Sequence, residues 1–348
     1  MRSKTCTLHA ISLCLLPLLT AGCLSDNLLS DHPGTSDKPV EIRMKSYIAG
    51  STANTRAGEG VIDKTLTKDL SVKFARVDAS TSGGNPTYSA TYGTSSIAGT
   101  ISKNNSTLTF TNQYYQPDGK NTKLIGWYPA EDTYDQSSRK VTFNSIDGET
   151  DIMVTPLKEG NKTSEIKDIA FKHLLTQIQI KVYTPDANTQ NFWGGLKSIT
   201  IGGMKQSCEV ILPDASSSAA GTEITAPAFS GSADLPLIKK TPTDNAEIKG
   251  GNNNAYGESN PLELGVGKDN AKLAGYAMFA PVGAGGSITL TVETANGTAQ
   301  ATATRTEGFV AGQSYVIILK FDASGITPTG TTITEWTTAE GSDTEITV

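Results

Sequence analysis

The chain has 348 residues, a formal net charge of -6 and four cysteines. Nucleic acids and anionic lipids require a basic surface, so the acidic charge argues against both as partners. Its length is sufficient for two ordinary domains. Its composition, rich in glycine, threonine and serine, favours β-structure over helix.

The first residues have the organisation of a secretory signal. The basic residues Arg2 and Lys4 precede the apolar run AISLCLLPLL, and small residues lead up to Cys23. The run is too short to cross a bilayer, which takes about 20 apolar residues. Its order of charge, apolar core and small residues is typical of an exported protein. We therefore expect residues 1–22 to be removed on export.

The signal ends in LTAGC, which resembles the lipobox of bacterial lipoproteins. In a lipobox the cysteine, here Cys23, is acylated and becomes the mature N-terminus. A plain signal peptide with an incidental cysteine is the alternative. Several acyl chains together anchor a protein stably in a membrane. Residues 23–38 are polar, with proline and glycine, and we expect them to form a tether.

Processing changes both the charge and the cysteine count. Without residues 1–22 the chain keeps 27 basic and 35 acidic residues, because Arg2 and Lys4 leave with no acidic residue, and the net charge becomes -8. Two further cysteines leave with the signal, and acylation occupies Cys23. Cys208 then stands alone, so no intramolecular disulfide is expected.

The segment VEIRMKSYI, residues 40–48, has the period of a half-buried β-strand. Val40, Ile42, Met44 and Ile48 fall on one face, and mostly polar residues fall on the other. This alternation is the signature of a strand, in which successive side chains point to opposite sides. The following segment, AGSTANTRAGEG, is small and polar, and we expect it to form an exposed loop.

Many short segments of β character follow, with turn residues between them. They are DLSVKFARV, STLTFTN, TKLIGWYPA, KVTFNSI, TDIMVTP, FKHLLTQIQIKVYT, LKSITIGGM, CEVIL, AGYAMFAPV, SITLTVET, AQATATR and SYVIILKF. No stretch shows a long period of 3.6 residues, so helices should be few and short. Many short strands with regular turns predict an all-β fold made of sandwiches.

Two domains are expected from the composition along the chain. The charged stretch LKEGNKTSEIKD, residues 157–168, contains few large apolar residues and is the predicted boundary. We therefore expect an N-terminal β-sandwich over residues 39–162 and a C-terminal one over residues 163–348. Residues 213–262 are rich in alanine, serine, asparagine, glycine and proline, and they predict long surface loops.

The chain offers few residues for catalysis or metal binding. Only one histidine, His173, lies beyond the signal and the tether, and a hydrogen-bonded strand residue is the ordinary case at such a position. With Cys208 it provides too few ligands for a zinc site. GVGKDN, residues 265–270, lacks the spacing of a phosphate loop and predicts a turn. We expect no enzyme, no metal and no cofactor.

Five motifs along the chain are informative when they are taken together. They are YYQPDGKNTKLIGWYPA, TDIMVTP, FKHLLTQIQIKV, GYAMFAPV and FVAGQSYVIILKFDASGITPTGTTITEW. Together they resemble the fimbrillin-like proteins of Bacteroidia, the type V pilins, over nearly the whole chain. The resemblance implies two tandem transthyretin-like β-sandwich domains with few short helices. It also implies export as a surface-exposed lipoprotein of the outer membrane and assembly with other fimbrial subunits into fimbriae that support adhesion.

The resemblance further implies how assembly is triggered. In these pilins an arginine-specific protease cuts the precursor after an arginine in the loop behind the first strand, and the matching bond here joins Arg56 and Ala57. Removal of the first strand, residues 39–48, would open a groove that its four apolar side chains had filled. A strand of another subunit would then enter by strand exchange. A flexible loop with an incidental arginine is the alternative. Arg43 and Arg76 lie in predicted strands and are poorer sites.

Two alternatives stay open in the sequence. A shaft subunit needs a long donor segment, and the C-terminal segment ITEWTTAEGSDTEITV is fairly short, which counts against that role. A tip or accessory subunit, which accepts a strand but need not donate one, and an anchor are the alternatives. The rival function is a surface lipoprotein that binds glycan or another host or bacterial ligand. Its platforms would be the aromatic pairs Tyr114 and Tyr115, Trp127 and Tyr128, and Phe192 and Trp193. An exposed aromatic strip would favour this rival, and a covered groove under residues 40–48 would favour the pilin.

Overall fold

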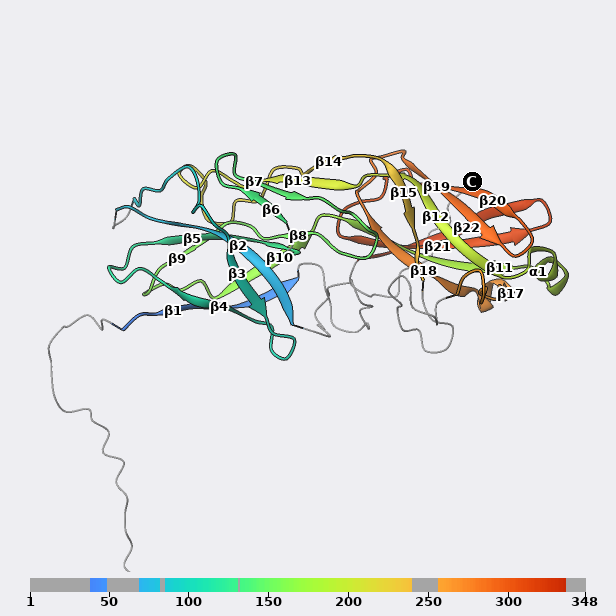
Figure 1. Ribbon diagram of the computed structural model, residues 1–348, viewed down its shortest axis with the longest axis horizontal. Coiled ribbons are helices and arrows are strands. Elements are labelled where there is room, and N and C mark those ends of the chain that lie inside the picture. Colours follow the sequence, from blue (N-terminus) through green and yellow to red (C-terminus); the bar gives the residue numbers. More distant parts are fainter. Residues whose placement is uncertain (1–37, 49–68, 82–84, 131, 240–255, 336–348) are drawn as a thin grey trace, which may run out of the picture. The chain divides into compact units, whose positions relative to one another are not determined.

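The computed structural model describes residues 38–48, 69–81, 85–130, 132–239 and 256–335, the last five of them by their backbone alone. Within these ranges nearly all regular structure is β-strand, in four sheets (Figure 1). The prediction of an all-β, sandwich-type fold is therefore confirmed.

Helical structure is confined to two short pieces of the described chain. The α-helix α1 covers Ala187–Trp193, and the 3-10 helix η1 covers Lys268–Asn270 within the segment predicted to be a turn. Asp186 caps α1, because its carboxylate accepts a hydrogen bond from the backbone N–H of Thr189 at 2.8 Å. Among the described residues no helix is long and apolar enough to cross a membrane.

The first sheet has eight strands in the order β2-β3-β4-β1-β10-β8-β5-β9. They are β1 (Glu41–Ile48), β2 (Leu70–Asp78), β3 (Ile97–Ile101), β4 (Thr107–Tyr114), β5 (Thr122–Tyr128), β8 (Met153–Val154), β9 (Lys158–Gly160) and β10 (Asp168–His173). Because β5 also pairs with β2, the strands from β2 round to β5 close into a ring. Strand β1 is a member of that ring.

Two further sheets form a sandwich in the second half of the chain. One contains β16 (Ile238–Lys239), β18 (Lys272–Phe279), β11 (Thr176–Thr184), β21 (Gln313–Asp322) and β22 (Gly325–Glu335), with β17 (Gly265–Val266) paired to β11. The other contains β15 (Ala233–Pro236), β12 (Leu196–Met204), β19 (Ser287–Thr294) and β20 (Thr298–Thr304). One continuous apolar core draws residues from both sheets, as in a sandwich.

The fourth sheet joins strands from both halves of the sequence. Its strands are β14 (Ala228–Ser230), β13 (Ser207–Ile211), β7 (Lys140–Phe143) and β6 (Thr133–Asp135), in that order. Val210 of β13 lies opposite Val141 of β7. The buried side chains of both belong to one apolar core with Ile125 and Trp127 of β5. This sheet therefore covers the outer face of the ring at β5.

The predicted boundary between residues 162 and 163 is crossed by hydrogen-bonded strands. β10 follows it in sequence but pairs with β1 and β8 of the first sheet. β13 follows it by more than 40 residues and pairs with β7. The division into domains 39–162 and 163–348 stays a prediction, and these pairings show that segments after residue 163 contribute to sheets of the first half.

The ring encloses its own apolar core, to which every strand of the ring contributes. The ring of Phe74 packs edge-on against Phe110 and Phe171, with centroids 5.1 and 6.1 Å away. Gly126 of β5 makes this position possible, since a Cβ there would lie 2.4 Å from the Phe74 ring. Ile42 of β1 is fully buried in the same core.

Candidate functional site

Strand β1 lies between β4 and β10 in the ring. It pairs antiparallel with β4, where Met44 lies opposite Leu108, and parallel with β10, where Lys45 lies opposite Asp168. Removal of β1 would therefore leave two neighbouring strands with unpaired edges and open the ring between them. Such edges are sites where another strand can add.

The inward face of β1 covers the core of the ring. Ile42 is 0% exposed, Met44 is 4% exposed and Ile48 is 6% exposed, while Val40 is half-buried and packs against the same core. These are the four apolar residues that the sequence places on one face. Ser46 is also buried on this face, and its hydroxyl donates to the backbone oxygen of Ser106 at 3.1 Å.

The outward face of β1 carries charged and polar contacts. Arg43 forms an ion pair with Glu41 of the same strand at 2.6 Å. The ammonium group of Lys45 donates to the backbone oxygen of Asn105 at 2.9 Å and to the hydroxyl of Thr107 at 3.2 Å. These exposed contacts contribute little stability individually. The burial of the inward face therefore accounts for most of the retention of β1.

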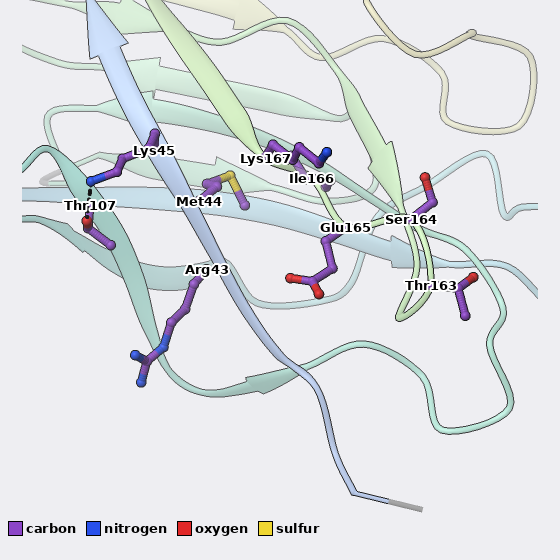
Figure 2. A pocket seen from close by; sticks show the side chains of 9 residues that line it. All are labelled: Arg43, Met44, Lys45, Thr107, Thr163, Ser164, Glu165, Ile166 and Lys167. Atoms are coloured by element: carbon purple, nitrogen blue, oxygen red, sulfur yellow. Dashed lines mark hydrogen bonds between the residues drawn. The ribbon is translucent and has the colours of Figure 1, made fainter. Parts of the chain in front are cut away.

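A pocket of about 540 Å³ lies beside the first half of β1 (Figure 2). It is lined by Arg43, Met44, Lys45, Thr107, Thr163, Ser164, Glu165, Ile166 and Lys167. The pairing of β1 with β10 begins only at Lys45, whose N–H donates to the oxygen of Lys167 at 2.9 Å. Before that point β1 and the segment 163–167 diverge, and we call the space between them the β1–β10 gap.

Three residues of the predicted site lie outside the described residues. These are the lipidation residue Cys23 and the two residues of the predicted cleavage site, Arg56 and Ala57. Their roles stay predictions. The two arginines judged to be poorer cleavage sites lie in regular strands, Arg43 in β1 and Arg76 in β2.

The two side chains with catalytic potential, those of His173 and Cys208, are both buried. The Nδ1 atom of His173 in β10 lies 2.5 Å from a carboxylate oxygen of Asp151, and both side chains are buried. The thiol of Cys208 is free and buried, and burial raises its pKa to about 12, so it is unreactive at neutral pH. Among the described residues no cluster of three or more metal-ligating side chains occurs.

The aromatic pairs do not form an exposed strip in the described part of the chain. Tyr115, Trp127 and Trp193 are buried in the cores, at 1%, 0% and 8% exposure. Their neighbours Tyr114 and Phe192 are exposed, but they belong to different elements, β4 and α1. Core packing therefore explains the buried member of each pair.

Comparison with known proteins points to one family. The family model described as fimbrillin-like matches residues 55–336. A solved structure of a candidate cell adhesion protein from Bacteroides uniformis is 15% identical, with a TM-score of 0.53 over 86% of this chain and 99% of that chain. This likeness supports the fold.

Two further solved structures are similar at lower TM-scores. A candidate cell adhesion protein from Bacteroides ovatus is 13% identical, with a TM-score of 0.49 over 87% of this chain and 99% of that chain. A fimbrial protein from Bacteroides vulgatus is 17% identical, with a TM-score of 0.44 over 76% of this chain and 92% of that chain. No curated protein matches the sequence.

Proposed function

Because the chain belongs to the fimbrillin-like family, we propose that it is a structural subunit of surface fimbriae that assembles by strand exchange at the position of β1. The main support for this proposal is the position of β1 in the ring. One short strand at the N-terminal end of the described chain covers the core of the ring and separates β4 from β10. The role is mechanical and adhesive, not catalytic.

Proteolysis supplies the trigger in this proposal. An arginine-specific protease cuts between Arg56 and Ala57, in the segment that joins β1 to β2. The cut separates β1 covalently from the rest of the ring, but its buried side chains and ladder hydrogen bonds keep it in place. A strand of another fimbrial subunit, from its C-terminal segment, then replaces β1 by β-augmentation. Since donor strand and groove are different surfaces, the contact is heterologous and continues as a filament.

Loss of the cleavage site should block assembly without unfolding the chain. Arg56→Ala is expected to abolish the early tryptic fragment that begins at Ala57 and to reduce incorporation into fimbriae, because β1 stays covalently attached. Limited digestion followed by N-terminal sequencing, together with quantification in sheared fimbriae, measures both effects. If the Ala variant assembles as well as the parent, processing at this bond is not the trigger.

Export as an outer-membrane lipoprotein forms the second part of the proposal. Acylation of Cys23 would hold the precursor at the membrane while residues 24–38 separate the ring from it. Cys23→Ala is therefore expected to move the protein from the membrane fraction to the soluble fraction, since no acyl chain is attached. Fractionation with an immunoblot measures this shift. Full retention in the membrane fraction would contradict lipidation at this residue.

A further inference from the structure

This inference rests on the proposed strand exchange and identifies where the exchange begins. We infer that the β1–β10 gap is the docking site of the incoming strand, and that displacement of β1 proceeds from Lys45 toward Ile48. The occupant is the acidic segment 336–348 of a second copy of the chain, in an extended conformation.

Strand β1 has more backbone pairing along its edge with β4 than along its edge with β10. On the side of β4, backbone contacts extend from the first residues of the strand, since the N–H of Tyr115 donates to the oxygen of Val40 at 2.9 Å. On the side of β10, the register begins at Lys45 and ends at Ile48. Residues 41–44 therefore have no strand partner there in the described chain. An incoming strand can enter on this side before any β1–β10 hydrogen bond breaks.

The gap has an apolar floor that continues the core of the ring. Met44 and Ile166 line it, and both side chains belong to the core that β1 covers. In Figure 2 Met44 lies on the side of β1 that faces the gap, and Glu165 projects from the opposite segment toward β1. A side chain seated on this floor would occupy the start of the groove, so that the following residues could replace β1 in register.

The charges around the gap favour an acidic occupant. Its lining residues include Arg43, Lys45 and Lys167 as cations and Glu165 as the one carboxylate. Arg43 is paired with Glu41, and Lys45 reaches toward Thr107 on the β4 side (Figure 2), so the surroundings keep one excess positive charge. Residues 336–348, WTTAEGSDTEITV, contain three acidic residues and no lysine or arginine. Their last residues alternate between polar and apolar, as a strand over an apolar floor requires. Complementary charge raises the rate of association more than its final strength.

The segment is short for a donor that would line a long groove, but the part of β1 that it must replace beside β10 is also short. Thirteen residues follow the last described residue, Glu335. An extended chain spans about 3.3 Å per residue. The segment can therefore fill the gap and continue along the four residues of β1 that pair with β10.

Peptide exchange into the cleaved protein tests this inference. A recognition sequence for a site-specific protease, inserted between residues 52 and 58, makes cleavage independent of Arg56. Two labelled peptides serve as probes. One is residues 39–48, which contain the strand that fills the groove in the structure, and the other is residues 336–348. If docking in the gap precedes release of β1, the exchange rate rises in proportion to the peptide concentration.

A matched pair of variants places the docking step. Glu165→Trp fills the gap from an exposed position, and it removes the one carboxylate that would repel an acidic peptide. It is expected to lower the exchange rate about tenfold, a change of about 1.4 kcal/mol in the barrier. Asn104→Trp adds the same ring at an exposed turn on the β4 side and should leave the rate unchanged.

The outcomes separate this inference from the proposed function. An exchange rate that does not depend on peptide concentration, or that Glu165→Trp leaves unchanged, would overturn docking in the gap but leave strand exchange intact. Exchange of peptide 39–48 without exchange of peptide 336–348 would show that the occupant comes from a different subunit. If neither peptide enters the cleaved chain, strand exchange itself is refuted.

Discussion

Ile42→Ala is expected to lower the free energy of unfolding of the uncleaved chain by about 2–5 kcal/mol, the usual cost of emptying a buried isoleucine site. Ile42 is fully buried, and its side chain lies in the core with Phe74 and Phe171. Those rings are fixed by their mutual edge-on contact, so the cavity left by the truncation cannot collapse easily. Chemical denaturation of the precursor measures the loss.

The matched control lies on the opposite face of the same strand. Tyr47 is 49% exposed, so Tyr47→Ala should change the stability by no more than about 0.5 kcal/mol. After cleavage, the Ile42→Ala chain should also exchange β1 faster than the parent, because the retained strand has fewer core contacts. Equal costs for the two substitutions would show that β1 does not cover the core in the way described.

The position of β1 could be predicted from the sequence because its alternation is local. Val40, Ile42, Met44 and Ile48 follow the two-residue period of a strand, and the structure buries the last three of them. Ser46 breaks the apolar pattern, although it is buried on the same face. Its hydroxyl finds a backbone acceptor on the turn before β4, a partner about 60 residues away that periodicity cannot reveal.

The closure of the ring could not be predicted in the same way. It depends on pairings between distant segments, such as Phe74 of β2 with Gly126 of β5 and Ser46 of β1 with Ile169 of β10. Each strand signals its own period but not its neighbours. For the same reason the boundary predicted between residues 162 and 163 places β10 in the second half, whereas β10 pairs with β1 of the first sheet.

The β1–β10 gap and the short strands near it could not be predicted from the sequence either. The charged composition around residue 163 predicts a domain boundary. A single apolar residue in such a stretch does not indicate that Ile166 packs in the core of the ring. The aromatic pairs were ambiguous because apolar packing and ligand stacking use the same residues. Only burial separates the two, as it does for Trp127, whose indole N–H also donates to Asp132 at 2.7 Å.

A covalent lock on β1 is expected to have the largest effect on assembly. Arg43 of β1 lies opposite Thr109 of β4. The N–H of Ser46 points to β4, since it donates to the oxygen of Ser106, and backbone groups alternate along a strand, so those of Arg43 point away from β4. The pair is therefore of the non-hydrogen-bonded type, with Cα atoms about 4.5 Å apart, which suits a disulfide.

The double variant Arg43→Cys with Thr109→Cys should therefore form a disulfide that ties β1 to β4. Cys208 should not compete for it, because its burial keeps the thiol protonated. Cleavage between Arg56 and Ala57 would still occur, but the cut strand could not leave. The single variant Thr109→Cys is the control, since it carries the same new thiol without the lock.

The amount of locked subunit in fimbriae sheared from cells tests the exchange of β1 most directly. Non-reducing electrophoresis confirms the disulfide, and N-terminal sequencing shows whether residues 39–48 are still attached. We predict that the locked chain is strongly depleted from the fimbriae, because it can donate its C-terminal segment but cannot accept one, whereas the Thr109→Cys chain is incorporated and lacks β1. Incorporation of the locked chain at the level of the control, with β1 still bound, would contradict assembly by strand exchange at this position.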